Sequence, residues 1–164
     1  MSIQIRHADD RDGQFITSLI QATLQDMQSV GGLEVNQDED FWLKYAEEIV
    51  ESIRKGDRLY LLAQIGSGIV GFLEGKIVTR HEVFTHRKIF HLSIVYAIPE
   101  SRRQGVATSL ANEALRWASV QGCHEAELNV LFNNDKAIGL YKKLGFNMFR
   151  YQLRMKLQHE FLEN

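Results

Sequence analysis

The spacing of apolar residues changes at Arg58, and this change limits the fold more than any other feature of the chain. Before Arg58, apolar residues recur every three or four positions from Phe15 to Met27 and from Phe41 to Ile53, which is typical of amphipathic helices. After Arg58, apolar runs at residues 59–65, 69–78 and 88–98 predict three strands, with a Gly66-Ser67-Gly68 turn between the first two. The chain therefore mixes helices and strands.

The remaining elements alternate between strand and helix. A short strand around Ile3 and Ile5 precedes the first helix, and Asp10 and Asp12 are its candidate caps. Beyond Pro99 we predict a helix that ends near Gly122, a strand at residues 125–131, a helix at 134–144 and a last strand from Phe146 to about Leu157. The predicted order is β-α-α-β-β-β-α-β-α-β, which favours an α/β domain with a mixed sheet.

Length and charge restrict the class of protein. The 164 residues, 45% of them hydrophobic, suit a single domain over residues 1–164. Nineteen basic and 21 acidic side chains give no reason to expect nucleic acid as a partner. The lone Cys123 favours a reducing compartment, and the charged start and the lack of a long apolar run predict a cytoplasmic protein without a membrane partner. A homodimer is compatible with the sequence.

Residues 95–108 are the segment that says most about what the chain binds. A strand breaks at Pro99 and enters a helix through a loop of small residues, so free N–H groups at the helix start suit a phosphate or pyrophosphate. Gly105 and Ala107 keep side chains out of the way, and Arg102 and Arg103 add positive charge. The alternative is an ordinary connection whose glycine relieves backbone strain. The nucleotide phosphate loop and the dinucleotide fingerprint are excluded, because the required glycines and lysine are missing.

A second motif follows the first at a distance of about 25 residues. It reads Asn134-x-x-Ala137-x-x-x-Tyr141 and continues into Leu144-Gly145-Phe146. Arg102-x-x-Gly105-x-Ala107 resembles the acetyl-CoA loop of the GNAT N-acetyltransferase superfamily, and the second motif resembles that family's second signature. The resemblance covers roughly residues 58–157. It departs at Ala97, where the family commonly has valine.

The resemblance implies a fold and a set of roles. The fold would be a mixed, mostly antiparallel central sheet flanked by helices, and acetyl-CoA would be the co-substrate. The backbone of Val95, Tyr96 and Ala97 would pair with the pantetheine arm and present an N–H to the thioester oxygen. Asn134 would hydrogen-bond the same arm. The pyrophosphate loop would comprise Arg102, Arg103, Gln104, Gly105, Val106, Ala107 and Thr108.

Acid–base chemistry is assigned in the same way. Tyr141 would lie near the sulfur, and a phenol with an ordinary pKa of about 10 can give its proton to a departing thiolate. The alternative is a core aromatic on a helix. No single candidate for the base stands out: Glu74 and His91 lie on strands and could each face a cleft. His81, Glu82 and His86 lie in the loop between those two strands. No metal is expected, because His81, Glu82 and His86 lack zinc-ligand spacing.

The predicted activity is transfer of an acetyl group to a primary amine by direct attack, since no cysteine or serine has the setting of a nucleophile. The alternative is an acyl-CoA-binding sensor or partner module without turnover. Between residues 26 and 51, eight acidic side chains are opposed by Lys44 alone, which favours a cationic amine as acceptor, either a small molecule or a peptide. The alternative explanation is that residues 38–40 complement a helix N-terminus and that Glu47, Glu48 and Glu51 form a solvated helix face.

Overall fold

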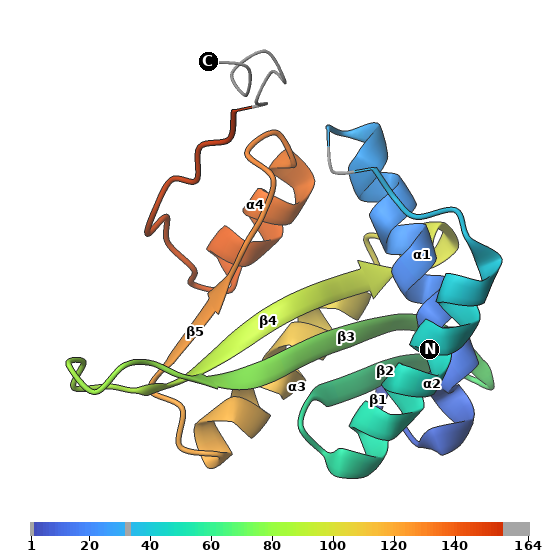
Figure 1. The fold of residues 1–164 in the computed structure, drawn as a ribbon, viewed down its shortest axis with the longest axis horizontal. Helices are drawn as coiled ribbons and strands as arrows, with labels where there is room; N and C mark the ends of the chain where they lie inside the picture. Colours follow the sequence, from blue (N-terminus) through green and yellow to red (C-terminus); the bar gives the residue numbers. More distant parts are fainter. Residues whose placement is uncertain (1, 32–33, 156–164) are drawn as a thin grey trace, which may run out of the picture.

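The computed structural model describes residues 2–31 and 34–155, which form one five-stranded sheet with helices on both faces (Figure 1). The sheet has the strand order β1-β2-β3-β4-β5, with three antiparallel pairings and a parallel β4–β5 pairing. Its strands are β1 Gln4–His7, β2 Leu59–Ile65, β3 Gly68–Thr79, β4 Lys88–Ala97 and β5 Glu125–Leu128. The helices are α1 Gly13–Ser29, α2 Glu39–Lys55, α3 Val106–Val120 and α4 Asp135–Lys143, with short 3₁₀ turns at Asp10–Asp12 and Pro99–Ser101. This architecture confirms the predicted fold class.

Helix α2 begins and ends where its local sequence predicts. The Asp38 side chain accepts a hydrogen bond from the Asp40 N–H, which caps the helix start. Gly56 adopts a left-handed conformation with φ of 64° and closes the last turn. The start of α1 differs, because Asp10 and Asp12 belong to a 3₁₀ turn that Asp9 caps.

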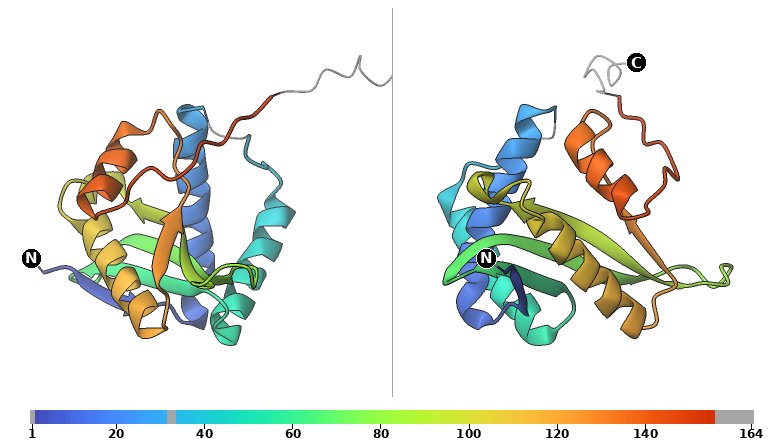
Figure 2. Two further views of the ribbon diagram at one scale, coloured as in Figure 1. Left: turned by 90° about the vertical axis from the view of Figure 1, so that its left-hand side faces the viewer. Right: turned by 180° about the vertical axis from the view of Figure 1, so that it is seen from behind.

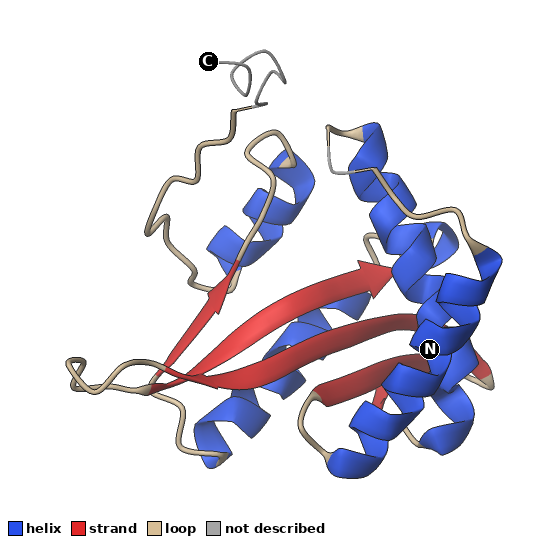
Figure 3. Ribbon diagram, in the orientation of Figure 1, coloured by secondary structure: helices blue, strands red, loops and turns tan. Residues whose placement is uncertain are grey.

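Two cores lie on the two faces of the sheet (Figures 2 and 3). On one face, α3 packs against apolar side chains that include Leu61, Leu73 and Phe90. On the other, α1 and α2 cover Leu62 and Phe72. Since both faces are covered, the central strands are apolar on both sides, which accounts for their continuous hydrophobic runs.

The predicted last strand is wrong within the described residues, because residues 146–155 form no strand; residues 156 and 157 lie outside the described part. Strand β5 also ends at Leu128 rather than at Leu131. Alternating apolar residues stabilise a strand when one of its faces is covered. Here Phe149, Tyr151 and Leu153 are 80%, 87% and 94% exposed, so these alternating apolar side chains are not covered by other residues.

A bulge in β4 sets which residues face which core. Glu74 lies opposite Ile94 and Gly75 lies opposite Leu92, so Ser93 is an extra residue in β4. Before the bulge, Phe90 and Leu92 face the α3 core, whereas after it Val95 and Ala97 face that core. Even-numbered residues of β4 therefore face the α3 core before the bulge, and odd-numbered residues face it after the bulge.

Gly75 allows β3 to pass over the buried ring of Phe90. A Cβ atom added at Gly75 would lie 2.3 Å from Phe90 Cζ, and Phe90 is fully buried with its ring 5.9 Å from that of Trp117. We expect Gly75→Ala to lower the free energy of unfolding by about 1–3 kcal/mol, measured by chemical denaturation. Gly68→Ala in the same strand is the matched control, because its Cβ would meet only ordinary contacts. Equal stability of the two variants would contradict the packing described.

Candidate functional site

The site begins where β5 leaves β4. The two strands pair from Ile89 to Leu92, next to the Ser93 bulge, and then diverge (Figure 1). From Ile94 to Ala97, β4 pairs with β3 alone among the described strands. The backbone of Val95, Tyr96 and Ala97 thus forms a strand edge that no described strand covers, to which an extended ligand can add like a further strand.

The loop after β4 has the backbone geometry of an anion site. Arg103 has a φ of 63°, which is unusual for a residue with a side chain, and Gly105 has a φ of 88°. Turns that contain left-handed residues can direct successive N–H groups to the same side. Helix α3 then begins at Val106 without a side-chain cap, so its first N–H groups, including those of Ala107 and Thr108, have no intrahelical acceptor.

Gly105 leaves this loop open. A Cβ atom built there would meet nothing within 4 Å. The neighbouring Gln104 turns its side chain back, and its amide donates to the Glu100 carbonyl at 2.9 Å. The space in front of the first N–H groups is therefore not filled by the side chain of Gln104.

The guanidinium of Arg102, which we expect to add positive charge to the loop, already has partners in the structure. It donates to Asp26 of α1 at 2.6 Å and to the Ala97 carbonyl at 3.1 Å, and it lies over the ring of Tyr96. Burial lowers the pKa of Arg102, but the Asp26 carboxylate and the Tyr96 hydroxyl raise it, and the net direction is upward. Asp26 precedes Arg102 by 76 residues, so the sequence offers no local signal for this pair.

The second motif builds helix α4. The Asn134 side chain accepts from the Ala137 N–H at 3.2 Å and so caps the helix, which leaves its NH₂ group able to donate. Gly145, with a φ of 96°, reverses the chain, and the Phe146 N–H then donates to the Tyr141 carbonyl. The rings of Tyr141 and Phe146 meet edge to face at 5.9 Å, and burial raises the pKa of the Tyr141 hydroxyl.

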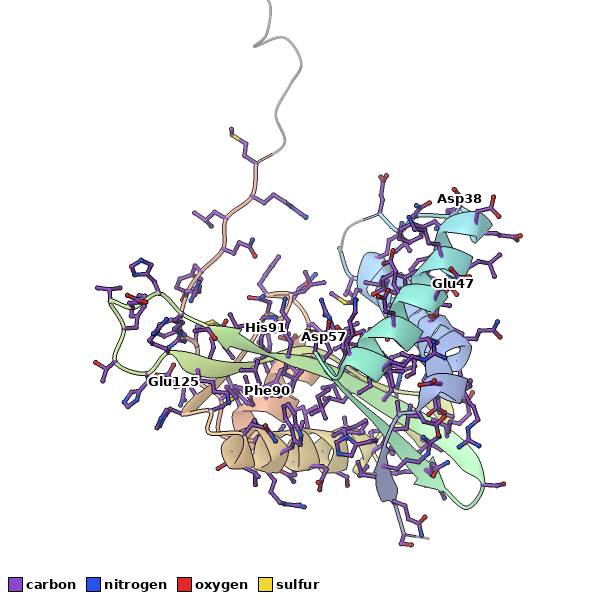
Figure 4. All side chains as sticks on the ribbon, turned by 60° about the horizontal axis from the view of Figure 1, so that its bottom comes forward. Asp38, Glu47, Asp57, Phe90, His91 and Glu125 are labelled. Carbon is purple, nitrogen blue, oxygen red and sulfur yellow. The ribbon has the colours of Figure 1, made fainter. Side chains whose placement is uncertain are left out.

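The two candidate bases differ in their surroundings. Glu74 is 4% exposed, lies beside Ile94 of β4 and is ion-paired with Arg58. His91 lies on β4 just before the bulge, with Nδ1 3.5 Å from Glu127 Oε1 on β5. Figure 4 labels His91 on the sheet. Within residues 2–31 and 34–155, no group of three or more His, Cys, Asp or Glu side chains is placed to hold a metal ion.

Two features of this region were missed by the sequence analysis. Asn133 donates to the Val30 carbonyl at 2.6 Å and so links the β5–α4 connection to the end of α1. A hollow of about 440 Å³ lies between α1 and α2, and its wall includes the amide side chains of Gln14, Gln21 and Gln25. The hollow shares no residue with the loop at 102–108 or with α4.

The acidic segment is partly occupied by structural contacts. Asp26 pairs with Arg102, Asp38 caps α2, and Glu51 pairs with Lys55 at 2.6 Å. Glu47 and Asp38 lie on the exposed side of α2, at separate points along the helix (Figure 4). Capping and ion pairing therefore account for three of the eight acidic side chains. None of the helices described is long and apolar enough to cross a membrane.

Comparison with solved structures shows a widely shared fold. A predicted acetyltransferase with acetyl-CoA from Clostridium acetobutylicum superposes with a TM-score of 0.76 at 17% identity, covering 96% of this chain and 99% of the other. The aminoglycoside N-acetyltransferase AAC(6')-Iy, in complex with a bisubstrate analogue, gives a TM-score of 0.73 at 19% identity over 96% of this chain and 99% of that one.

Sequence relatives are similar over part of their length. The mouse thialysine N-epsilon-acetyltransferase is 35% identical over 80 residues, which is 49% of this chain and 45% of the mouse protein. An N-alpha-acetyltransferase of Sulfurisphaera tokodaii is 28% identical over 102 residues, 59% of this chain and 61% of that protein. The chain thus spans about half the length of the mouse relative that it matches. The model of the acetyltransferase (GNAT) family matches residues 17–146, and the chain belongs to this family.

Proposed function

We propose that the protein is an N-acetyltransferase that moves the acetyl group of acetyl-CoA to a primary amine. The observation that carries this proposal is the joint placement of the free β4 edge and the uncapped start of α3, joined by a loop with two left-handed residues. The edge at residues 95–97 suits the amide-rich pantetheine arm, and the N–H groups at residues 104–108 suit the pyrophosphate. The open space at Gly105 leaves room for the phosphate oxygens.

Tyr141 is proposed as the acid. The amine nitrogen attacks the thioester carbon, the carbon–sulfur bond breaks, and the leaving thiolate takes a proton. Burial raises the pKa of the Tyr141 hydroxyl, so this group keeps its proton at neutral pH and has one to give. The Asn134 amide, with its oxygen engaged in the helix cap, retains NH₂ donors for the pantetheine arm.

The transfer is proposed to be direct, without an acetyl-enzyme intermediate. Burial raises the pKa of the Cys123 thiol, which keeps it protonated and a weak nucleophile. Cys123 also packs against the core on the α3 face of the sheet, and it is the only cysteine of the chain. Acceptor and acetyl-CoA then have to be bound at the same time.

Glu74 and His91 are proposed as the two candidates for the general base, which takes the proton of the attacking ammonium. Glu74 is one strand away from the free β4 edge, but its carboxylate is engaged with Arg58. His91 is next to the bulge at which the edge begins. We expect the substitution of the true base to lower kcat/KM by about 10²–10⁴-fold and to leave the affinity for acetyl-CoA unchanged.

The comparison of Glu74→Gln with His91→Gln identifies the base. Glu74→Gln also breaks a partly buried ion pair, so its thermal stability is measured together with the kinetics. A loss confined to kcat/KM in one folded variant assigns the base to that residue. If both folded variants retain full kcat/KM, neither residue is the base.

The acceptor is proposed to be a cationic amine. The relatives are named for acetylation of a thialysine, of N-alpha amines and of aminoglycosides, all of which carry amino groups. Glu47, Glu48 and Asp40 remain exposed on α2 and make the local electrostatic potential more negative.

We further propose a cytoplasmic location, because a lone thiol suits a reducing compartment. Size-exclusion chromatography tests whether the protein forms a homodimer.

Release of free thiol from acetyl-CoA tests the proposed activity. The protein is mixed with acetyl-CoA and a panel that pairs cationic with neutral amines, and CoA release is compared with a no-amine control. An enzyme releases CoA only when an accepted amine is present. A sensor or partner module binds acetyl-CoA in the same calorimetric titration but releases none with any amine.

A further inference from the structure

The end of α1 is attached to the loop that we propose binds the pyrophosphate. Asp26, in the last turn of α1, holds Arg102 with an oxygen–nitrogen distance of 2.6 Å. The same guanidinium donates through Nε to the Ala97 carbonyl at the end of β4. Arg102 stands three residues before Gly105, within the loop at residues 102–108 that leads into α3.

The Asp26 carboxylate and a phosphate are both anionic hydrogen-bond acceptors for the Arg102 guanidinium. Guanidinium groups bind carboxylate and phosphate oxygens by the same charge-assisted hydrogen bonds, and a pyrophosphate brings more charge and more acceptors than one carboxylate. The side chains of Arg102 and Asp26 are 45% and 55% exposed. An ion pair this exposed is weak enough to be exchanged for a better partner.

We propose that the Asp26 carboxylate competes with the CoA pyrophosphate for the Arg102 guanidinium, so that Asp26 sets the affinity of the protein for CoA. Without CoA, the guanidinium bridges α1 and β4. With CoA, it leaves Asp26 and adds its donors to those of the loop. This inference rests on the proposed function, because it needs the pyrophosphate at residues 102–108.

Electrostatics gives the direction of the effect. Asp26 places a negative charge within a few ångströms of Arg102, and both its competition for the guanidinium and its repulsion of phosphate weaken CoA binding. Asp26→Asn removes the charge and keeps the shape of the side chain. We therefore expect Asp26→Asn to bind CoA about two- to fivefold more tightly at low salt, the range that an exposed ion pair supports.

Calorimetric titration of the full chain with CoA tests this proposal. Asp10→Asn is the matched control, because Asp10 also pairs with an arginine, Arg54, at 2.7 Å and is similarly exposed. Asp10→Asn is expected to bind CoA like the wild type, and Asp26→Glu, which retains the charge, to stay close to it. In an Arg102→Gln background, Asp26→Asn should raise the affinity for CoA by less, because Asp26 and the pyrophosphate no longer share a guanidinium partner. Dephospho-CoA, which retains the pyrophosphate, should show the same gain as CoA.

The outcomes separate this inference from the proposed function. Unchanged or weaker CoA binding by a folded Asp26→Asn protein, with the wild type binding CoA, would overturn the competition and leave the proposed function standing. An equal gain in the Arg102→Gln background would overturn the role of Arg102. A wild-type protein that binds no CoA would overturn the proposed function, and this inference with it.

Discussion

Gly105→Glu is expected to lower the affinity for acetyl-CoA by at least about a hundredfold, because it places a carboxylate where the pyrophosphate would lie. A Cβ at this position meets nothing within 4 Å, so a glutamate side chain has room beside the uncapped start of α3. The negative charge repels phosphate and gives the first N–H groups of α3 an acceptor of their own. Isothermal calorimetry with acetyl-CoA measures the loss.

A matched substitution isolates the effect of position. Gly66, in the β2–β3 turn, also has a positive φ, 61°, and open space at its Cβ. Gly66→Glu therefore brings the same backbone strain and charge at a site away from the loop, and it should retain wild-type affinity. If Gly105→Glu stays folded and binds acetyl-CoA as tightly as Gly66→Glu, the pyrophosphate does not bind at this loop.

Tyr141→Phe is expected to lower kcat by about 10²–10⁴-fold while the affinity for acetyl-CoA stays within a few-fold of the wild type. The substitution removes only the hydroxyl, so the ring still packs against Phe146. Steady-state kinetics together with calorimetry separates the loss of a proton donor from the loss of binding. Tyr151→Phe is the control, since Tyr151 is 87% exposed and should leave kcat unchanged.

The direction of the Tyr141 pKa adds a second test. The acid form is the active one, and burial raises the pKa of the hydroxyl, so ionisation of Tyr141 removes activity only at strongly alkaline pH. The wild-type kcat should stay high as the pH rises through the ordinary tyrosine pKa of about 10. A kcat of Tyr141→Phe within a few-fold of the wild-type value would return Tyr141 to the role of a core aromatic.

Much of the fold follows from local sequence. Helix α2 has its cap residue, its periodic apolar face and its terminal glycine in one continuous segment, and the structure confirms its bounds. Strands β2 to β4 follow from apolar runs because both faces of the sheet are covered. The loop at residues 102–108 precedes a helix, as the small residues at 105 and 107 predict.

Other features depend on contacts between distant segments and have no local signal. The alternation after Phe146 predicts a strand, yet residues 147–155 are exposed and form no strand. Arg102 looks like a free cation in the sequence, and only the fold brings Asp26 to it. The bulge at Ser93, which defines the free edge of β4, requires the register of β3 and is not visible in β4 alone.

The central claim is that acetyl-CoA lies along the free edge of β4 with its pyrophosphate at the start of α3. Amide hydrogen exchange, resolved by residue, measures this with and without saturating CoA. The account predicts slower exchange at residues 95–97 and 104–108 and no change in the Gly66–Gly68 turn. Unchanged exchange at residues 104–108, or protection confined to residues 35–37 beside the α1–α2 hollow, would contradict it.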